Sequence, residues 1–464
     1  MLVEKYEPVN LFRLVPLERD PVLEQLDRLL DEDKLFQAVK ADLALRHPHT
    51  LTRGRPSTPV EVTLRMLVVK HLYKWSYEKT ERFVADSITL RQFCRVYLEP
   101  VPDDSTMIKW ANLLQPETLH QLLEHVVAMA QRLKVTRGRK LRTDGTVVES
   151  NIHHPTDSGL LVDGVRVLSR ALGRARKVIE LASAQMGQVT QKVFRNRLRS
   201  ARNRAREISR ITRSRSQEAQ ERCRHLYQKL VHVTQASVKQ AQQVVTVLQQ
   251  VASQEAQALV AQLTHFVPLV EQVIQQTVRR VVAGEKVPAK EKLVSIFEPH
   301  TYIIRRGKKG RPVEFGHKVW LDEVEGGIVS HYRVLEGNPK DQAQWIPSLK
   351  HHLALFEHSP DQASADRGLY SPDNEAHAKQ MGVRRVILPK PGYRSVQRKE
   401  HERQPWFRRG RRYHHGVEGR ISVLKRRHGL DRCPYHGEAG FERWVGWGVI
   451  AHNLLTIAST LAAR

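Results

Sequence analysis

The sequence has few cysteines, and this scarcity excludes two common ways of stabilising a fold. Cys94, Cys223 and Cys433 are the only three in 464 residues, and they lie far apart without a CxxC pair. Structural zinc sites and disulfide frameworks need more numerous or more closely spaced cysteines. We therefore expect neither, and the pattern fits a protein of the reducing cytosol.

Long apolar runs are also lacking. We find no run that reaches the length needed to span a bilayer, which is about 20 residues. The first residues, MLVEKYEPVNLF, are too acidic for a signal peptide, and their apolar part is too short. We expect a soluble, cytoplasmic protein with no membrane partner.

Acidic residues are scarce relative to basic ones. The chain has 49 Asp and Glu against 76 Lys and Arg, a net charge of +27. Such an excess repels itself unless a polyanion neutralises it, and nucleic acid is the usual partner. A basic protein of the ribosomal or heparin-binding type is the alternative. Because 40% of the residues are hydrophobic and the chain is longer than one core usually supports, we expect two or three folded domains.

Residues 1–135 are predicted to be a helical domain that binds DNA or mediates dimerisation. Apolar residues recur at three- and four-residue spacing in PVLEQLDRLL, VEVTLRMLVVKHLYKW and PETLHQLLEHVVAMAQRL. Asp104 or Ser105 is the predicted N-cap of a further helix. Two short helices with a tight polar turn would suit a helix-turn-helix unit, and a simple packed hairpin is the alternative.

Residues 136–162 are predicted to begin an α/β core, because 139–150 alternate as a strand with Asp144 at its centre, in an interior position. Residues 163–290 are predicted to be a helical arm inserted into that core. Nine arginines and a single acid, Glu207, occur between residues 195 and 215. A solvated helix face is the alternative, but so many like charges favour contact with phosphate, and Arg197 and Arg204 are candidates for it. Residues 236–283 suggest a helical hairpin or coiled coil.

Residues 291–464 are predicted to complete the α/β core. Three alternating stretches in HTYIIRRGKKGRPVEFGHKVWLDEVEGGIVSHYRVLEG predict antiparallel strands. A helix, the short strand of QASADRGLYS, a helix ended by Gly382, the strand of VRRVILPK and two more helices are expected to follow. Trp444 and Trp447, in the last helix, are predicted to lie in the core. The order of elements is that of a mixed α/β domain.

Three acids stand out in this order of elements. Asp144 lies in the middle of a strand, and Asp366 lies where a short apolar strand meets a loop, a position at which α/β sheets bind ligands. Glu418 lies near the start of a helix, seven residues before Lys425. Seven residues are about two helical turns, so both side chains point the same way. A salt-bridge stripe is the alternative, although the two are too far apart to pair well.

Three carboxylates brought together would repel one another unless a cation held them. Hard oxygen ligands select Mg²⁺ or Mn²⁺. Two such ions about 3.5–4 Å apart can activate a water or hydroxyl and stabilise the leaving oxygen of a phosphodiester. With the basic composition, this set predicts phosphoryl-transfer chemistry on DNA or RNA with two metal ions.

Several segments resemble the DDE transposases of prokaryotic insertion sequences. They are TDGTVVESNIHHPTDS, ADRGLYS, GVEGRISVLKRRHGLDRCPYHG and ERWVGWGVIAHNL, with RPSTPVEVTLRMLVVKHLY and DDSTMIKW nearer the N-terminus. The resemblance covers nearly the whole chain, the arm being its least diagnostic part. It implies a ribonuclease H-like catalytic core, with a long helical insertion and an all-α N-terminal domain.

The resemblance also implies roles for single residues. Asp144, Asp366 and Glu418 would be the catalytic residues and metal ligands, and in several such families a Lys follows the Glu by seven residues, as Lys425 does here. Lys425 would contact the phosphate of the element's end or the flanking strand. Further phosphate contacts are expected from Arg420, Arg426 and Arg427.

The sequence departs from the family pattern just before Glu418. Related families have an Arg four residues before the Glu and a Tyr three residues before that Arg. Here these places hold His414 and Arg411, and Tyr413 is shifted by two. The Tyr and Arg contacts of the family are therefore not carried over, although His414 or Arg412 could contact phosphate.

Other acids compete with the three chosen ones. Glu149 lies an odd number of residues from Asp144, so it should point to the other face of the strand. Asp157 is predicted to form a turn, Asp322 to be an exposed acid at a strand end and Asp341 to be a helix N-cap. Asp163 is the remaining acid close to this strand in the sequence.

Histidines offer a second type of metal ligand. His153 and His154 are adjacent, but we expect loop contacts with DNA or a surface position more than metal binding. Cys433 and His436 are too isolated to form a zinc site.

These observations predict a transposase that binds the terminal inverted repeats of its element as double-stranded DNA. It would cut the DNA by metal-dependent hydrolysis and join the 3′-hydroxyl to target DNA. The resemblance implies a homodimer on DNA, and through DNA an association with the nucleoid. A non-catalytic architectural DNA-binding protein, a related nuclease and an inactivated transposase copy are the alternatives.

Overall fold

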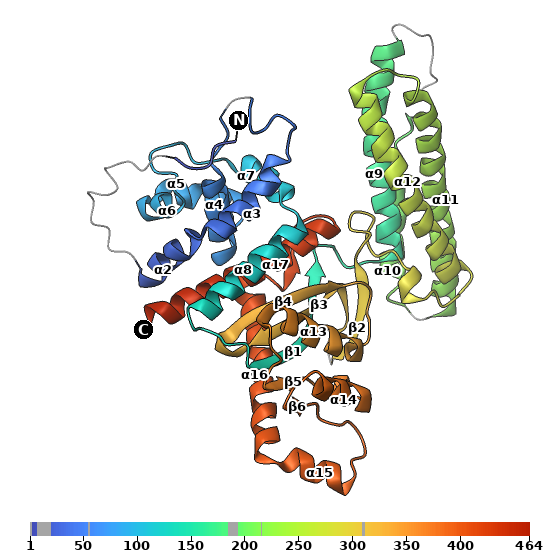
Figure 1. Ribbon diagram of the computed structural model, residues 1–464. Helices are drawn as coiled ribbons and strands as arrows, with labels where there is room; N and C mark the ends of the chain where they lie inside the picture. The colour runs from blue at the N-terminus through green and yellow to red at the C-terminus, as the bar shows by residue number, and fades with distance from the viewer. Residues whose placement is uncertain (1, 7–19, 54–55, 184–193, 215, 309–310) are drawn as a thin grey trace. The chain divides into compact units, whose positions relative to one another are not determined.

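The computed structural model describes residues 2–6, 20–53, 56–183, 194–214, 216–308 and 311–464. The chain forms two compact units. One consists of Met1–Asn151 with Gly316–Arg464, and the other is Ile152–Phe315, so the second unit is an insertion into the first (Figure 1). The predicted arm, 163–290, lies within this insertion.

The first unit begins with helices that end near the predicted boundary at residue 135. The segments PVLEQLDRLL, VEVTLRMLVVKHLYKW and PETLHQLLEHVVAMAQRL form helices as predicted. The predicted N-cap at Asp104 or Ser105 is wrong, because Asp103 is the cap and its carboxylate accepts a 2.7 Å hydrogen bond from the Thr106 N–H. The helices are α2 (Pro21–Leu30), α3 (Asp33–Ala44), α4 (Val60–Leu72), α5 (Tyr77–Asp86), α6 (Ile88–Phe93), α7 (Asp104–Leu113) and α8 (Pro116–Arg132).

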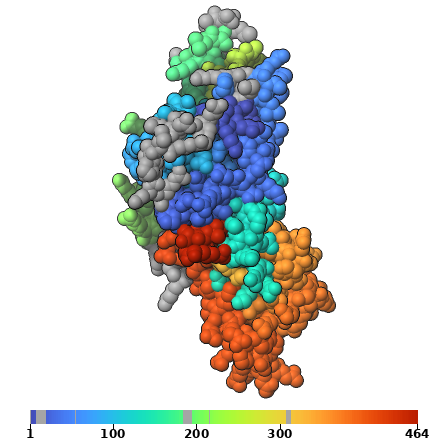
Figure 2. All heavy atoms as spheres, turned by 60° about the vertical axis from the view of Figure 1, so that its left-hand side comes forward, coloured from blue at the N-terminus to red at the C-terminus, as the bar shows by residue number. Residues whose placement is uncertain are grey.

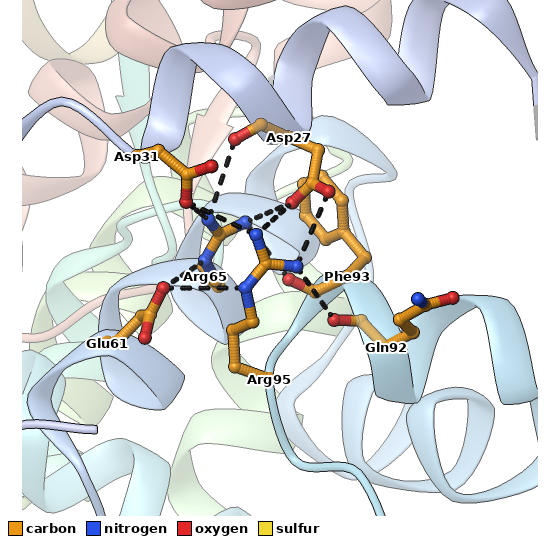
Figure 3. A network of polar contacts seen from close by, with 7 residues as sticks. All are labelled: Asp27, Asp31, Glu61, Arg65, Gln92, Phe93 and Arg95. Atoms are coloured by element: carbon orange, nitrogen blue, oxygen red, sulfur yellow. Dashed lines mark hydrogen bonds and ion pairs between the residues drawn. The ribbon is translucent and has the colours of Figure 1, made fainter. Parts of the chain in front are cut away.

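A buried charge network holds the helices α2, α4 and α6 together (Figure 3). Arg65 has a fully buried side chain and pairs with Asp27 at 2.7 Å, with Asp31 at 2.6 Å and with Glu61 at 3.2 Å. Arg95, which follows α6, pairs with the same three acids. Because the carboxylates face two guanidinium groups, the buried charges compensate one another.

A mixed sheet lies at the centre of the α/β part of this unit. Strand β1 pairs antiparallel with β3 on one side and parallel with β5 on the other, and β5 pairs parallel with β6. Beyond β3, β4 continues the sheet antiparallel, and β7 pairs parallel with the end of β1. β2 pairs with β3. The strands are β1 (Lys140–Ser150), β2 (Tyr302–Lys308), β3 (Arg311–Val324), β4 (Ile328–Leu335), β5 (Gln362–Ser364), β6 (Arg385–Ile387) and β7 (Arg432–Cys433).

Helices and short turns complete the core. The predicted strands and helices after residue 290 are present, whereas α15 and β7 were not predicted, and α16 begins earlier than expected. The turns are η4 (Glu325–Gly327), η5 (Asp341–Gln344) and η6 (Arg367–Leu369), and the helices are α13 (Trp345–Phe356), α14 (Pro372–Gln380), α15 (Val396–Arg403), α16 (Pro405–His428) and α17 (Glu438–Ala462).

The last helix, α17, joins the sheet to the N-terminal helices. It packs against α2, α4, α8, α16 and β4, and its C-terminal end (red) emerges beside α8 in the space-filling view (Figure 2). Trp444 and Trp447 are buried, as predicted. By length and composition α17 could cross a membrane, which corrects the expectation that no such run exists. Two thirds of the most apolar 18-residue stretch of α17 is buried, as in a core helix.

The insertion has a hydrophobic core of its own. Helices α9, α10, α11 and α12 pack against one another, and α11 and α12 form the helical hairpin that the sequence predicted. The elements are α9 (Asp157–Ser183), α10 (Leu198–Ile211), α11 (Gln217–Leu248), α12 (Gln254–Thr277), the π-helical η2 (Val278–Val282) and the turn η3 (Ala289–Glu291).

Three predictions about acids are wrong. Asp157 is not in a turn but is the first residue of α9, where it is buried and pairs with Arg280. Asp322 is not exposed, since it is buried and accepts a 2.6 Å hydrogen bond from Thr143. Asp341 is not an N-cap, because it is the first residue of η5 and pairs with Lys318. In each case a distant cation or hydroxyl compensates the carboxylate.

Candidate active site

Asp144 lies on β1, and Asp366 lies two residues beyond the end of the neighbouring parallel strand β5. Arg142 of β1 is in register with Ser364 of β5. Asp144 and Asp366 are each two residues further along (144 − 142 and 366 − 364), so the two acids extend from the same edge of the β1–β5 pair. Asp144 is in β1 as predicted, but its side chain is only partly buried and it accepts a 2.7 Å hydrogen bond from the Gly145 N–H.

Helix α16 is attached to β1 at two points, and Glu418 lies between them. Arg142 donates to the Tyr413 carbonyl at 2.5 Å, and Lys425 donates to the Val147 carbonyl at 2.7 Å. Asp144 lies between Arg142 and Val147 on the strand. Glu418 lies between Tyr413 and Lys425 on the helix. The third predicted acid is thus placed alongside the first.

One flank of α16 carries His414, Glu418 and Lys425. At 3.6 residues per turn these three lie within about 40° of one another around the helix axis. His414 contacts Asp366 and Lys425 contacts β1. Glu418, which is exposed, therefore lies on the flank of α16 whose other two residues contact Asp366 and β1.

A small cavity of about 240 Å³ lies beside Asp366. His414 is 3.3 Å from the Asp366 carboxylate, and its own Nδ1 is buried without a hydrogen-bond partner among the described residues. The His414 hydrogen bond and the nearby charges of His415 and Arg367 hold the pKa of the Asp366 carboxyl below its usual range. Arg411 also lines the cavity. Asp366 is therefore ionised at neutral pH and lies among basic groups.

The donor chemistry of this site fits a hard divalent cation. Asp144, Asp366 and Glu418 offer carboxylate oxygens, which Mg²⁺ and Mn²⁺ prefer. Across the described ranges, however, no three His, Cys, Asp or Glu side chains are close enough together to hold one metal ion. Binding of an ion would need the side chains to close around it. His153 is 3.2 Å from Asp163, and His154 packs against Phe315.

The predicted DNA-binding residues divide into exposed and engaged side chains. Arg412, Arg426 and Arg427 are exposed on α16. His414 and Lys425 are engaged with Asp366 and Val147 as described. Arg420 donates to Glu323 at 3.1 Å and to His452 at 3.1 Å. In the insertion, Arg197 donates to Gln240 and Arg204 to Ser200.

A buried triad joins β1, β3 and α16, and no local sequence pattern points to it. Glu323 of β3 has a side chain that is 1% exposed, and it pairs with Arg142 at 2.5 Å and with Arg420 at 3.1 Å. The segment VWLDEV contains two adjacent acids, Asp322 and Glu323. Strand alternation alone does not tell which of the two points toward α16. The partners of Glu323 are far away in the sequence, so only the fold identifies it.

Known families match both ends of the chain. Residues 9–113 match the family described as "Transposase domain (DUF772)", and residues 374–458 match the "Transposase DDE domain". The second match includes Glu418 and Lys425 but stops short of Asp144 and Asp366. Together these matches support a DDE transposase of an insertion sequence, and the predicted family is confirmed.

A curated relative, described as "Uncharacterized protein ORF8 in nfe locus" of Rhizobium meliloti, is 28% identical over 123 residues. The similar segment is 25% of this chain and 59% of the relative, so the chain spans about three fifths of the relative's length. No solved structure matches the chain.

Proposed function

We propose that the protein binds the terminal inverted repeats of its element, cuts the DNA there and joins the 3′-hydroxyl end to target DNA. The observation that supports this proposal is that β1, which carries Asp144, β5, which precedes Asp366, and α16, which carries Glu418, all pack against one another. The sheet, with antiparallel β4, β3 and β1 followed by parallel β5 and β6, supports a ribonuclease H-like core. The match to transposase families at both ends supports the choice of substrate.

Each acid has a distinct structural support in this reaction. Asp144 is held by strand β1, and Asp366 is held by its contact with His414. Glu418 is held by α16, which is bonded to β1 both before and after Glu418. When bound, Mg²⁺ or Mn²⁺ would activate the attacking oxygen and stabilise the leaving oxygen of the phosphodiester. His414 would keep one Asp366 oxygen fixed, so that the other is free to turn toward a cation.

The test is a cleavage assay on DNA that carries the element ends, with Mg²⁺ or Mn²⁺. Asp144→Asn, Asp366→Asn and Glu418→Gln should each lose cleavage and retain DNA binding, because they remove charge without removing volume. If all three cut as well as the parent, the catalytic assignment is wrong. If the parent binds the ends and never cuts, the protein is an architectural protein or an inactive copy. Cutting at any sequence would indicate a nuclease.

DNA contact outside the site is proposed for helix α10 of the insertion. Ala201 and Ile208 face its core, whereas one exposed stripe of α10 carries Arg199, Arg202, Arg206 and Arg210. At 3.6 residues per turn the stripe covers about 80° of the helix surface, and at 1.5 Å per residue it is about 17 Å long. None of these four has an ion-pair or hydrogen-bond partner among the residues that the structure describes. They are better placed for phosphate than Arg197 and Arg204.

Salt dependence tests the stripe. Changing its four arginines to Gln should reduce the slope of log K against log salt by about 0.9 for each phosphate that the protein no longer neutralises. The matched control changes the same number of charges on α9, namely Arg170, Arg174, Arg176 and Lys177, all exposed. Equal slopes for the two variants would refute contact by α10. A homodimer on paired ends remains a proposal, which sedimentation of the DNA complex tests.

A further inference from the structure

The buried triad of Arg142, Glu323 and Arg420 joins the elements that carry two of the proposed catalytic acids. Glu323, on β3, accepts hydrogen bonds from Arg142 at 2.7 Å and 2.5 Å through two guanidinium nitrogens. It accepts a third, at 3.1 Å, from Arg420. Arg142 is two residues before Asp144 on β1, and Arg420 is two residues after Glu418 on α16. One carboxylate thus connects both segments.

Two glycines leave room for the arginines. A Cβ atom at Gly416 of α16 would lie 2.2 Å from the Arg142 Nη1, and one at Gly327 of η4 would lie 2.1 Å from the Arg420 Nη2. Gly327 also has a φ of +76°, which favours glycine. A side chain at either place would force the nearby guanidinium group to shift. The local backbone is therefore shaped around the triad.

Arg420 attaches one flank of α16 to β3. Arg420 and Glu418 are two residues apart, so they lie about 160° apart around the helix axis. Holding Arg420 against β3 on one flank therefore directs Glu418 to the other flank, where His414 contacts Asp366. The bidentate pair of Arg142 with Glu323 has a fixed planar geometry, and it holds in place the carboxylate that Arg420 contacts. Arg420 also donates a hydrogen bond from its Nη1 to the Nε2 of His452 on α17, at 3.1 Å.

We propose that Glu323, with Arg142 and Arg420, is a positioning residue that sets the height and rotation of Glu418 relative to Asp144. The inference rests on the proposed function, because it assigns Asp144 and Glu418 to the reaction. It replaces the predicted phosphate contact of Arg420 with a role inside the protein. The triad does not touch substrate, and it acts through the acids that it aligns.

The test compares Glu323→Gln with Glu402→Gln in the full-length protein. Glu402 is the matched control, because its side chain is 4% exposed and it also pairs with two arginines, Arg394 and Arg398, both at 2.9 Å. These partners lie on α15 and just before it, away from the strands β1 and β3. Both variants lose one buried charge, so both should lower stability toward urea. Only Glu323→Gln should disturb the alignment of the acids.

Three measurements separate positioning from a general loss of stability. Glu323→Gln should weaken Mn²⁺ binding to the DNA complex, followed by electron paramagnetic resonance, by about 10- to 100-fold, the usual effect of losing a group that orients metal ligands. It should lower kcat for cleavage by a similar factor. The KM for DNA carrying the ends should stay within about twofold, because the substrate contacts are intact. Glu402→Gln should change none of the three.

The outcomes distinguish failure of the positioning role from failure of the proposed function. If Glu323→Gln binds Mn²⁺ and cleaves like Glu402→Gln, the positioning role is refuted, while loss of cleavage in Asp144→Asn would still support the proposed function. If Asp144→Asn cleaves normally, the proposed function fails first. Should Glu323→Gln not fold, Gly416→Ala provides the same test, since its methyl group displaces Arg142 and leaves all charges present. Normal Mn²⁺ binding and cleavage by Gly416→Ala would then overturn the inference.

Discussion

Two buried arginine networks in the first unit share their chemistry and differ in what they connect. Around Arg65, two arginines and three acids join helices to helices (Figure 3). Around Glu323, two arginines and one acid join a strand pair to α16. The first network lies among elements without any proposed catalytic residue. The second joins β1, which carries Asp144, to α16, which carries Glu418.

The difference shows that burial and charge alone do not identify a functional group. Replacing a whole buried ion network with apolar residues is often neutral for stability, whereas removing one partner is costly. Both networks should therefore behave alike when a single charge is deleted and stability is measured. Only a measurement of chemistry should separate them, because only one network sets the position of reacting groups.

The largest expected effect is on stability, in the N-terminal network. Arg65→Met leaves Asp27 and Glu61 with Arg95 alone, and it should lower the free energy of unfolding by roughly 3–5 kcal/mol. Urea unfolding measures this loss. Cleavage per folded molecule should be unchanged, since Arg65 pairs only with acids of the N-terminal helices. Arg28→Gln, which removes an exposed pair with Glu24, is the control and should cost about 0–1 kcal/mol.

A milder change in the second network should affect cleavage more than stability. Arg420→Lys retains the charge but loses the planar fork, so Glu323 would be held less firmly. We expect cleavage to fall by about tenfold, in line with the loss of an orienting group. Arg65→Lys is the comparison, and it should leave kcat unchanged. Equal kcat values for the two variants would remove the distinction between the networks.

Two glycines on α16, Gly416 and Gly419, should change stability in opposite directions when they are replaced by alanine. An exposed helical Gly→Ala change usually stabilises by about 0.5–1 kcal/mol. Gly419→Ala should do so, because a Cβ there meets nothing within 4 Å. Gly416→Ala should instead destabilise, since its methyl group collides with Arg142. Urea midpoints show whether each variant is more or less stable than the parent. A gain in stability in both variants would contradict the close fit of Arg142.

The smallest expected effect concerns pH, at the control carboxylate Glu402. Burial raises its pKa, but hydrogen bonds from the Lys390 N–H, Arg398 and Arg394 outweigh it and leave the pKa below the usual value. A depressed folded-state pKa contributes stability that is present above the unfolded pKa, about 4.3, and is lost as the pH falls through the folded one. The stability difference between the parent and Glu402→Gln should therefore be largest at pH 7 and shrink below about pH 4.3. A constant difference in urea titrations would contradict this.

Much of the fold could be predicted from local patterns. Helical periodicity located α2, α4 and α8, and alternation located β1, β3 and β4, although α4 and the second half of β3 are buried on all sides. Of the acids chosen by position, Asp144 lies on β1 and Asp366 follows the end of the neighbouring strand β5. The roles of Asp157, Asp322 and Asp341 were predicted wrongly, since their partners Arg280, Thr143 and Lys318 are distant in the sequence.

The sequence by itself determined the charge excess, the helical insertion, the transposase family and the identity of the candidate acids, because residue type and spacing carry that information. Only the tertiary structure decided which basic residues face solvent and which are used internally. Arg420 was predicted to bind phosphate, yet it turns inward to Glu323. The reason is physical: the buried carboxylate of Glu323 on β3 needs a cation to compensate it, and pairing across 97 residues leaves no trace in local sequence.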